Sequence, residues 1–238
     1  MKILEIKNLK YKYQDNHEAL KDISLILNRG EKVGLAGANG SGKSTLLLNI
    51  AGAFPIQYGK IFLNENEVTN FEMLRKSIGL IFQDPDDQII MPTVIEDTAF
   101  NLVASGMNVK DAQEKSLNIL DKLGILHLKD RAPHNLSGGE KRMTSLAGIL
   151  ISEPEILALD EPTSALDPGA RRRVINFLKN TDKTILLASH DLDMILDVCS
   201  RAVILNHGLI SADGFLPELF KNKTLLEKNG LELPLRYA

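Results

Sequence analysis

The sequence has no tryptophan, a single cysteine and few aromatic residues, which make up 5% of its 238 residues. One cysteine cannot form an internal disulfide, so the disulfide framework of a small secreted domain is excluded and a reducing compartment is expected. Cys199 follows the apolar run from Met194 to Val198. We therefore expect it to be a core thiol rather than a nucleophile.

A strong excess of charge of one sign and long apolar runs are also missing. The formal net charge is −3, which gives no global positive field, so we expect no nucleic-acid partner. No window contains the roughly 18 uncharged apolar residues that a membrane span needs, and the N-terminal residues turn polar at once. Because 44% of the residues are hydrophobic, we predict a soluble globular chain that reaches a membrane only through partners.

Apolar runs of strand length alternate with helical patterns along most of the chain. We predict strands at 3–9, 23–27, 33–36, 61–63, 78–82, 156–159, 184–188 and 202–205, and helices at 43–51, 168–178 and 192–198. This alternation predicts an α/β fold, a parallel sheet with helices on both faces. Between the strands predicted at 78–82 and 156–159, apolar residues recur only at helical spacing, at 93–104 and 111–123. This spacing predicts a mostly helical insertion.

A glycine-rich loop follows the predicted strand at 33–36 and opens a helix: Gly37-Ala38-Asn39-Gly40-Ser41-Gly42-Lys43-Ser44. In this context its backbone N–H groups can cradle phosphate oxygens, and Lys43 can reach the β- and γ-phosphates. The Ser44 hydroxyl can bind Mg²⁺. An incidental glycine turn does not account for both the strand before the loop and the helix after it, so the loop predicts nucleotide binding.

Polar residues follow three other predicted strands, at the sheet edge where ligands of open α/β sheets bind. They are Gln83, the pair Asp160 and Glu161, and His190. Asp160 suits outer-sphere contact with Mg²⁺, while Glu161 is placed to polarise an attacking water. Acidic residues after a strand can also cap a helix, and a lone histidine is often structural. Together with the phosphate loop, however, four such strand ends predict a hydrolytic site.

The segment Leu136-Ser137-Gly138-Gly139-Glu140 predicts the start of a helix. Ser137 can act as the N-cap and Glu140 stands three residues later, which is the pattern of a capping box. The two glycines remove side chains from the positive end of the helix, so an anion could approach its N–H groups. Asp167 and Pro168 likewise form an N-cap and N1 pair, whose structural interpretation stays open beside any functional one.

These motifs, in this order, resemble the ATP-binding cassette (ABC) ATPases over residues 13 to about 214. The resemblance implies one domain over 1–238: a core with an N-terminal antiparallel β subdomain at 1–83 and 148–214, a helical subdomain at about 84–147 and a tail at 215–238. It also implies that ATP binds to the loop from Gly37 to Thr45. Tyr13 would stack on adenine, although it could equally be a strand aromatic whose face Tyr11 shares.

The resemblance further implies roles for the residues at the strand ends. Gln83 would sense Mg²⁺ and the attacking water, with Ser44, Gln83 and Asp160 at the metal, and Glu161 and His190 would act in catalysis. In this family the signature of one subunit completes the ATP site of another. Ser137, Gly138, Gly139 and Asp167 would therefore contact ATP in trans, and the chain would dimerise with itself or with a homologous subunit.

A finer resemblance connects the segments 82–88 and 93–100 to the ATPase subunits of energy-coupling factor (ECF) transporters, the vitamin and transition-metal importers of prokaryotes. A Pro-Asp turn is the structural alternative for the first segment. The tail at 225–234 most resembles the cobalt and nickel members. The implied protein is a peripheral ATPase at the cytoplasmic face of the cell membrane, with transmembrane energy-coupling and substrate-binding subunits. The alternatives are a soluble ABC ATPase, the ATPase of another ABC transporter class, and a module that binds nucleotide but barely hydrolyses it.

Overall fold

A computed structural model describes residues 1–238, which form two compact units. The first unit contains residues 1–80, 155–161 and 178–238, and the second contains residues 81–154 and 162–177. The second unit is larger than the helical segment predicted at 84–147, because residues 162–177 pack with it. None of the helices combines the length and the apolar character that a membrane crossing requires.

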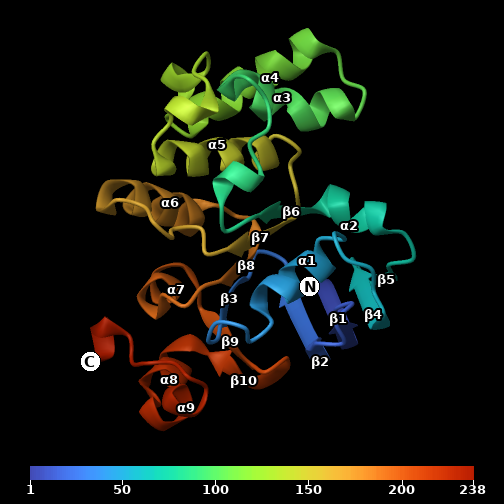
Figure 1. Cartoon of the computed structure of the whole chain (residues 1–238), viewed down its shortest axis with the longest axis vertical. Helices are drawn as coiled ribbons and strands as arrows, with labels where there is room; N and C mark the ends of the chain where they lie inside the picture. The colour runs from blue at the N-terminus through green and yellow to red at the C-terminus, as the bar shows by residue number, and fades with distance from the viewer. The chain divides into compact units, whose positions relative to one another are not determined.

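The first unit contains a six-stranded sheet in the order β10-β9-β3-β8-β7-β6 (Figure 1). Strand β3 lies parallel to β8 and β9, and β7 lies parallel to β8. Every residue of β7 and β8 is buried, as expected for parallel strands that are covered on both faces. The strands are β3 (Lys32–Ala36), β6 (Ile78–Ile81), β7 (Ile156–Asp160), β8 (Thr184–Ala188), β9 (Arg201–Asn206) and β10 (Leu209–Phe215).

Strand β10 is absent from the sequence-based prediction. It pairs antiparallel with β9 at the edge of the sheet, and none of its side chains is fully buried. An edge strand needs no continuous apolar run, so its sequence, LISADGF, carries little strand signal.

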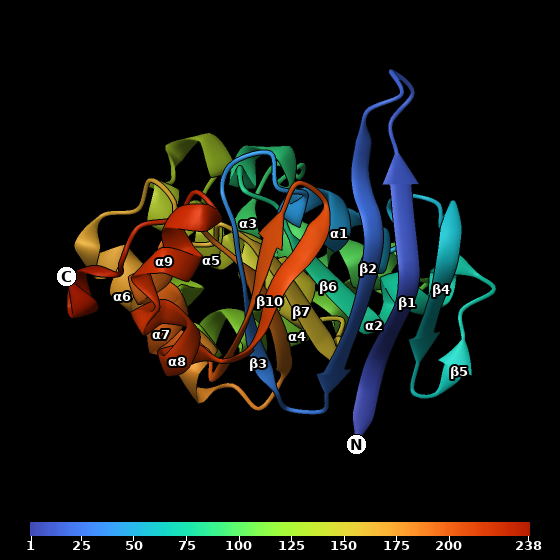
Figure 2. The same cartoon turned by 90° about the horizontal axis from the view of Figure 1, so that it is seen from below.

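A second, antiparallel sheet in the same unit has the order β2-β1-β4-β5. Strands β1 (Lys2–Lys12) and β2 (Glu18–Asn28) form a long hairpin, which Figure 2 shows in blue beside β4 (Tyr58–Leu63) and β5 (Asn66–Glu67). Its apolar face joins β3 and the following helix in one hydrophobic core. The predicted N-terminal antiparallel sheet is confirmed.

Short helices complete the first unit. Helix α1 (Lys43–Ile50) follows the glycine-rich loop and buries Leu46, Leu47 and Ile50 in the core. Helix α7 (Leu192–Val198) follows His190, and its N-cap Asp191 accepts the Met194 N–H at 2.9 Å. The others are α2 (Phe71–Ser77), α8 (Leu216–Lys221), α9 (Lys223–Lys228) and the 3₁₀ turn η4 (Leu235–Tyr237).

The second unit is helical, and its two predicted helices are confirmed as α3 (Val94–Ala104) and α4 (Val109–Lys122). Helix α4 buries residues four apart, Ala112, Ser116 and Leu120, because this spacing puts them on one face. Helix α3 packs against α4 and α5. The remaining elements are η1 (Pro85–Asp87), η2 (Leu126–Leu128), η3 (Pro133–Asn135), α5 (Gly138–Leu150) and the first part of α6 (Pro168–Asn180).

Cys199 directly follows α7 in the first unit. The residue is partly exposed, and burial of its thiol raises the pKa to about 12, which agrees with the expectation that Cys199 is not a nucleophile. At pH 8 the reactive thiolate fraction is then roughly three orders of magnitude below that of a free cysteine. We expect a chromogenic thiol reagent to modify the folded chain correspondingly slowly and the denatured chain at once. Rapid modification of the folded chain would show instead that this thiol is accessible.

Candidate active site

The glycine-rich loop joins β3 to α1 and folds back tightly on itself, so the predicted strand, loop and helix are confirmed. The Ser41 N–H donates to the Ala38 carbonyl at 3.1 Å, and the Gly208 N–H donates to the Ser41 carbonyl at 3.0 Å. Gly42 has a φ of +108°, and a Cβ atom there would lie 2.8 Å from the Ala19 carbonyl oxygen. Only glycine combines this backbone conformation with so close an approach.

Lys43 is held inside the loop by backbone carbonyls. Its Nζ lies 2.7 Å from the Gly37 oxygen and 3.1 Å from the Ala38 oxygen, and the residue is only 7% exposed. Burial lowers the pKa of Lys43, and the nearby Glu161 and Asp160 carboxylates oppose this shift. A buried ammonium group of this kind is stabilised by an anion such as a phosphate.

Two further features of the loop fit a phosphate. The Ser41 hydroxyl is buried without a hydrogen-bond partner, an arrangement that is unfavourable unless a ligand supplies the partner. The N-cap of helix α1 is Gly42, which has no side chain to cap the helix, so the N–H groups of its first turn can bind an anion. Ser44 in that turn is exposed, and a Cβ atom at Gly40 would meet nothing within 4 Å.

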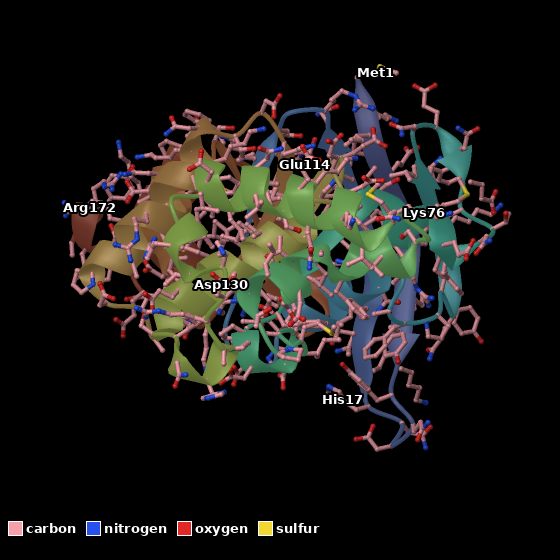
Figure 3. All side chains as sticks on the ribbon, turned by 90° about the horizontal axis from the view of Figure 1, so that it is seen from above. Met1, His17, Lys76, Glu114, Asp130 and Arg172 are labelled. Carbon is pink, nitrogen blue, oxygen red and sulfur yellow. The ribbon has the colours of Figure 1, made fainter.

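Tyr13 directly follows β1 and reaches α1. Its hydroxyl lies 2.9 Å from Thr45 Oγ1, and its ring is edge-on to Tyr11 and Phe54, at centroid distances of 5.2 and 5.9 Å. These three aromatic residues line a surface pocket of about 900 Å³ at the turn between β1 and β2, where Figure 3 labels His17. The pocket offers aromatic faces on which a nucleotide base could stack.

Glu161 and His190 meet at the carboxyl ends of β7 and β8. Because Asp160 pairs with Ala188 in the sheet, the residues after the two strands are neighbours. Glu161 Oε1 accepts the His190 N–H at 2.7 Å and lies 2.6 Å from His190 Nδ1, while Oε2 accepts the Ser189 hydroxyl at 2.7 Å. Glu161 is 7% exposed. The predicted meeting of strand ends is therefore confirmed for this pair.

The predicted capping box at the start of α5 is confirmed. The Ser137 hydroxyl accepts the Glu140 N–H at 3.3 Å, and the Glu140 carboxylate accepts the Ser137 N–H at 2.7 Å, which lowers the pKa of Glu140. A Cβ atom at Gly139 would lie 2.4 Å from the Cβ of Ala170 in α6, whereas one at Gly138 would meet nothing closer than 3.9 Å. Gly139 thus permits the packing of α5 on α6, and Gly138 leaves the helix end clear.

Asp167 caps α6, as its sequence position predicts. Its Oδ1 accepts the N–H groups of Ala170 at 2.9 Å and Gly169 at 2.8 Å, and these two bonds lower the pKa of Asp167. Gln83 is exposed and belongs to the second unit, whereas Asp160 and Ser44 belong to the first. The metal site and the contacts in trans stay predictions.

Arg142 on α5 is a residue that the sequence analysis missed. It is 1% exposed, and its guanidinium donates to the carbonyl oxygens of Phe82 and Gln83 at 2.5 Å each. Arg142 therefore fixes the backbone that carries Gln83. Its sequence neighbours Glu140 and Lys141 are also charged, so the sequence carries no signal that Arg142 is the buried one.

We expect Arg142→Met to lower the free energy of unfolding by about 2–6 kcal/mol, since two carbonyls would lose their partner at about 1–3 kcal/mol each. Urea denaturation measures this loss. Lys141→Met is the matched control, because its pair with the exposed Asp86 at 2.6 Å should contribute less than about 1 kcal/mol. Equal losses in the two variants would contradict the role given to Arg142.

Comparisons with known proteins agree on one family. The model described as ABC transporter matches residues 20–164, more than half of the chain. The energy-coupling factor transporter ATP-binding protein EcfA of Methanothermobacter thermautotrophicus is 37% identical over 98% of this chain and 77% of its own length. The structure of cbiO1 from Clostridium perfringens, part of the ABC transporter complex cbiONQ, is 35% identical with a TM-score of 0.83, over 95% of this chain and 94% of its own.

A dimeric bacterial ABC transporter cassette has 25% identity and a TM-score of 0.80, over 90% of this chain and 99% of its own. The chain therefore belongs to the ABC transporter family and has the ABC ATPase fold. Its class of activity is ATP hydrolysis.

Proposed function

We propose that the chain is the ATP-hydrolysing subunit of an ECF-type importer, which dimerises around ATP and drives uptake of a transition metal ion, cobalt or nickel, or of a vitamin. The observation that carries the hydrolytic part is the contact of Glu161 with His190. It lies at the edge of the sheet where β3 enters the phosphate loop. The importer class is supported by the names of two relatives, an energy-coupling factor ATPase and a member of a cbiONQ complex.

ATP would bind across the first unit. The buried ammonium of Lys43 and the hydroxyl of Ser41, with the N–H groups from Asn39 to Thr45, would hold the β- and γ-phosphates. The aromatic pocket beside Tyr13 would receive adenine. Binding would give the buried hydroxyl of Ser41 its missing partner.

The residues that would hold Mg²⁺ offer oxygen atoms, from the Ser44 hydroxyl, the Gln83 amide and, through outer-sphere contact, the Asp160 carboxylate, and such hard donors fit Mg²⁺. When bound, Mg²⁺ would neutralise part of the negative charge of the phosphates. Glu161 would accept a proton from the attacking water, and His190, which donates to Glu161 through its backbone N–H, would sense the γ-phosphate.

A second subunit, either another copy or a homologous chain, would complete the site. Its Ser137, Gly138, Gly139 and Asp167 would approach the γ-phosphate. The N–H groups at the start of α5 that Ser137 does not cap would then face the anion. The dimeric state of a cassette that shares this fold supports the proposal that two subunits associate. Loss of the γ-phosphate would remove these contacts and reopen the dimer.

The proposed place of the chain is the cytoplasmic face of the membrane, bound to transmembrane energy-coupling and substrate-binding subunits, without a nucleic-acid partner. A soluble ABC ATPase and the ATPase of another transporter class are the alternatives. The ECF assignment and these alternatives differ in the proteins that the chain should bind in its native cell. An ECF-type subunit should be recovered with small hydrophobic membrane proteins.

The test is to purify the tagged chain from its native membrane in mild detergent and identify the copurifying proteins. Hydrophobic subunits that include a separate substrate-binding protein would support the ECF assignment, whereas ribosomal proteins or an absence of membrane subunits would contradict it. Uptake of cobalt and nickel after deletion of the gene then tests the cargo. Unchanged uptake of both metals would remove the metal assignment and leave the ATPase assignment standing.

A further inference from the structure

Ser189 connects three elements of the first unit through one buried residue. Its N–H donates to the Leu35 carbonyl of β3 at 3.2 Å. Its hydroxyl donates to Glu161 Oε2 at 2.7 Å and accepts the Asp191 N–H, at the start of α7, at 3.0 Å. Ser189 is 0% exposed, so the position of this hydroxyl is set by protein groups alone.

The bonds to Glu161 leave its carboxylate one acceptor position. A carboxylate offers about four such positions, two on each oxygen. His190 fills the two on Oε1, one with its backbone N–H and, in the tautomer protonated at Nδ1, one with Nδ1, which lies 2.6 Å from that oxygen. Ser189 fills one of the two on Oε2. The position that remains is therefore on Oε2, the oxygen that Ser189 holds.

The main chain of Glu161 does not by itself fix the orientation of its carboxylate. Glu161 has a φ of +45°, in the left-handed region that non-glycine residues seldom adopt. Its N–H is held by the Ala188 carbonyl at 2.9 Å, which fixes the main chain but not the rotation of the carboxylate. That rotation is set by Ser189 on one oxygen and His190 on the other.

We propose that Ser189 is a positioning residue for ATP hydrolysis: its hydroxyl fixes the Glu161 carboxylate so that the remaining acceptor position on Oε2 is presented to the attacking water in one orientation. This rests on the proposed role of Glu161 as general base. The water oxygen bonds to the γ-phosphorus as the bond from phosphorus to the ADP oxygen breaks. Oε2 takes the proton from that water, and Ser189 keeps its own.

The experiment compares Ser189→Ala and Ser189→Cys with the unchanged full chain, in ATP and Mg²⁺, at concentrations where it hydrolyses ATP. We expect kcat to fall roughly 10-fold in Ser189→Ala, a part of the 10²–10⁴-fold that a positioned base contributes. Ser189→Cys, which keeps the size but donates more weakly, should fall between. KM and the affinity for a fluorescent ATP analogue should stay within about two-fold, because Ser189 acts on the base and not on bound nucleotide.

Thr184→Val is the matched control, because it removes a buried hydroxyl at the opposite end of β8, where Thr184 Oγ1 accepts the Gly30 N–H at 2.9 Å. A graded loss of kcat at Ser189 with an unchanged rate in Thr184→Val supports the proposal. An unchanged kcat in Ser189→Ala, or an equal loss in the control, overturns it.

Glu161→Gln is measured alongside. If Glu161→Gln is inactive while Ser189→Ala keeps its rate, the base assignment stands and only the role of Ser189 fails. If Glu161→Gln hydrolyses ATP normally, the base assignment fails and the role of Ser189 fails with it.

Discussion

Glu161→Gln should lower the rate of ATP hydrolysis roughly 10²–10⁴-fold, the usual contribution of a general base, and leave ATP affinity nearly unchanged. The amide has the shape of the carboxylate and can still accept the His190 N–H, which Glu161 Oε1 accepts at 2.7 Å. It cannot take a proton from water. Phosphate release measures the rate, and titration with a fluorescent nucleotide measures the affinity.

Glu155→Gln provides a control for this substitution. Glu155 directly precedes β7, whereas Glu161 directly follows it, and Glu155 pairs with Arg29 at 2.9 Å. The same chemical change at the other end of the strand should alter the rate by less than about two-fold, because partly exposed ion pairs contribute little. Should Glu161→Gln retain a tenth or more of the rate, another group must act as the base.

Lys43→Met should weaken ATP binding about 100-fold or more, which corresponds to about 3 kcal/mol. The substitution keeps most of the side-chain length but removes the positive charge. Lys43 is only 7% exposed, and its ammonium group is held between the Gly37 and Ala38 carbonyls. A buried cation interacts with phosphate more strongly than an exposed one, because solvent screens it less. Calorimetric titration with a non-hydrolysable ATP analogue measures the loss.

Lys32→Met is the corresponding control at a partly buried lysine. Lys32 begins β3, and Lys43 follows the loop at the end of that strand. Its Nζ also donates to a backbone carbonyl, that of Lys179, at 2.5 Å, and burial also lowers its pKa. ATP affinity should be unchanged in Lys32→Met. A similar loss of affinity in both variants would indicate general destabilisation rather than loss of a phosphate ligand.

The elements that the sequence predicts well are those with a local cause. The capping box of Ser137 and Glu140 depends on two residues three positions apart, and the structure confirms both of its hydrogen bonds. The strands at the centre of the main sheet were predictable because their residues are all buried and, apart from Asp160 and Thr184 at the strand ends, all apolar. Edge strand β10 lacks that signal.

Contacts between distant segments were harder to predict from the sequence. The order of the motifs placed Glu161 and His190 at one sheet edge, but only the register of β7 against β8 shows that Ser189 and His190 together hold both oxygens of one carboxylate. Arg142 was missed for a similar reason, because its partners are carbonyl groups about 60 residues earlier in the chain. Backbone acceptors leave no residue-type signal in a sequence.

The central claim is that two cassettes enclose ATP, with the Ser137 to Gly139 segment of one subunit completing the site of the other. It is tested most directly by the molar mass of Glu161→Gln in solution, measured by light scattering after gel filtration with ATP and Mg²⁺ or with ADP and Mg²⁺. The measurement includes any homologous ATPase subunit that copurifies. We predict the mass of two cassettes with ATP and of one with ADP; the mass of a single cassette with ATP bound would contradict the claim.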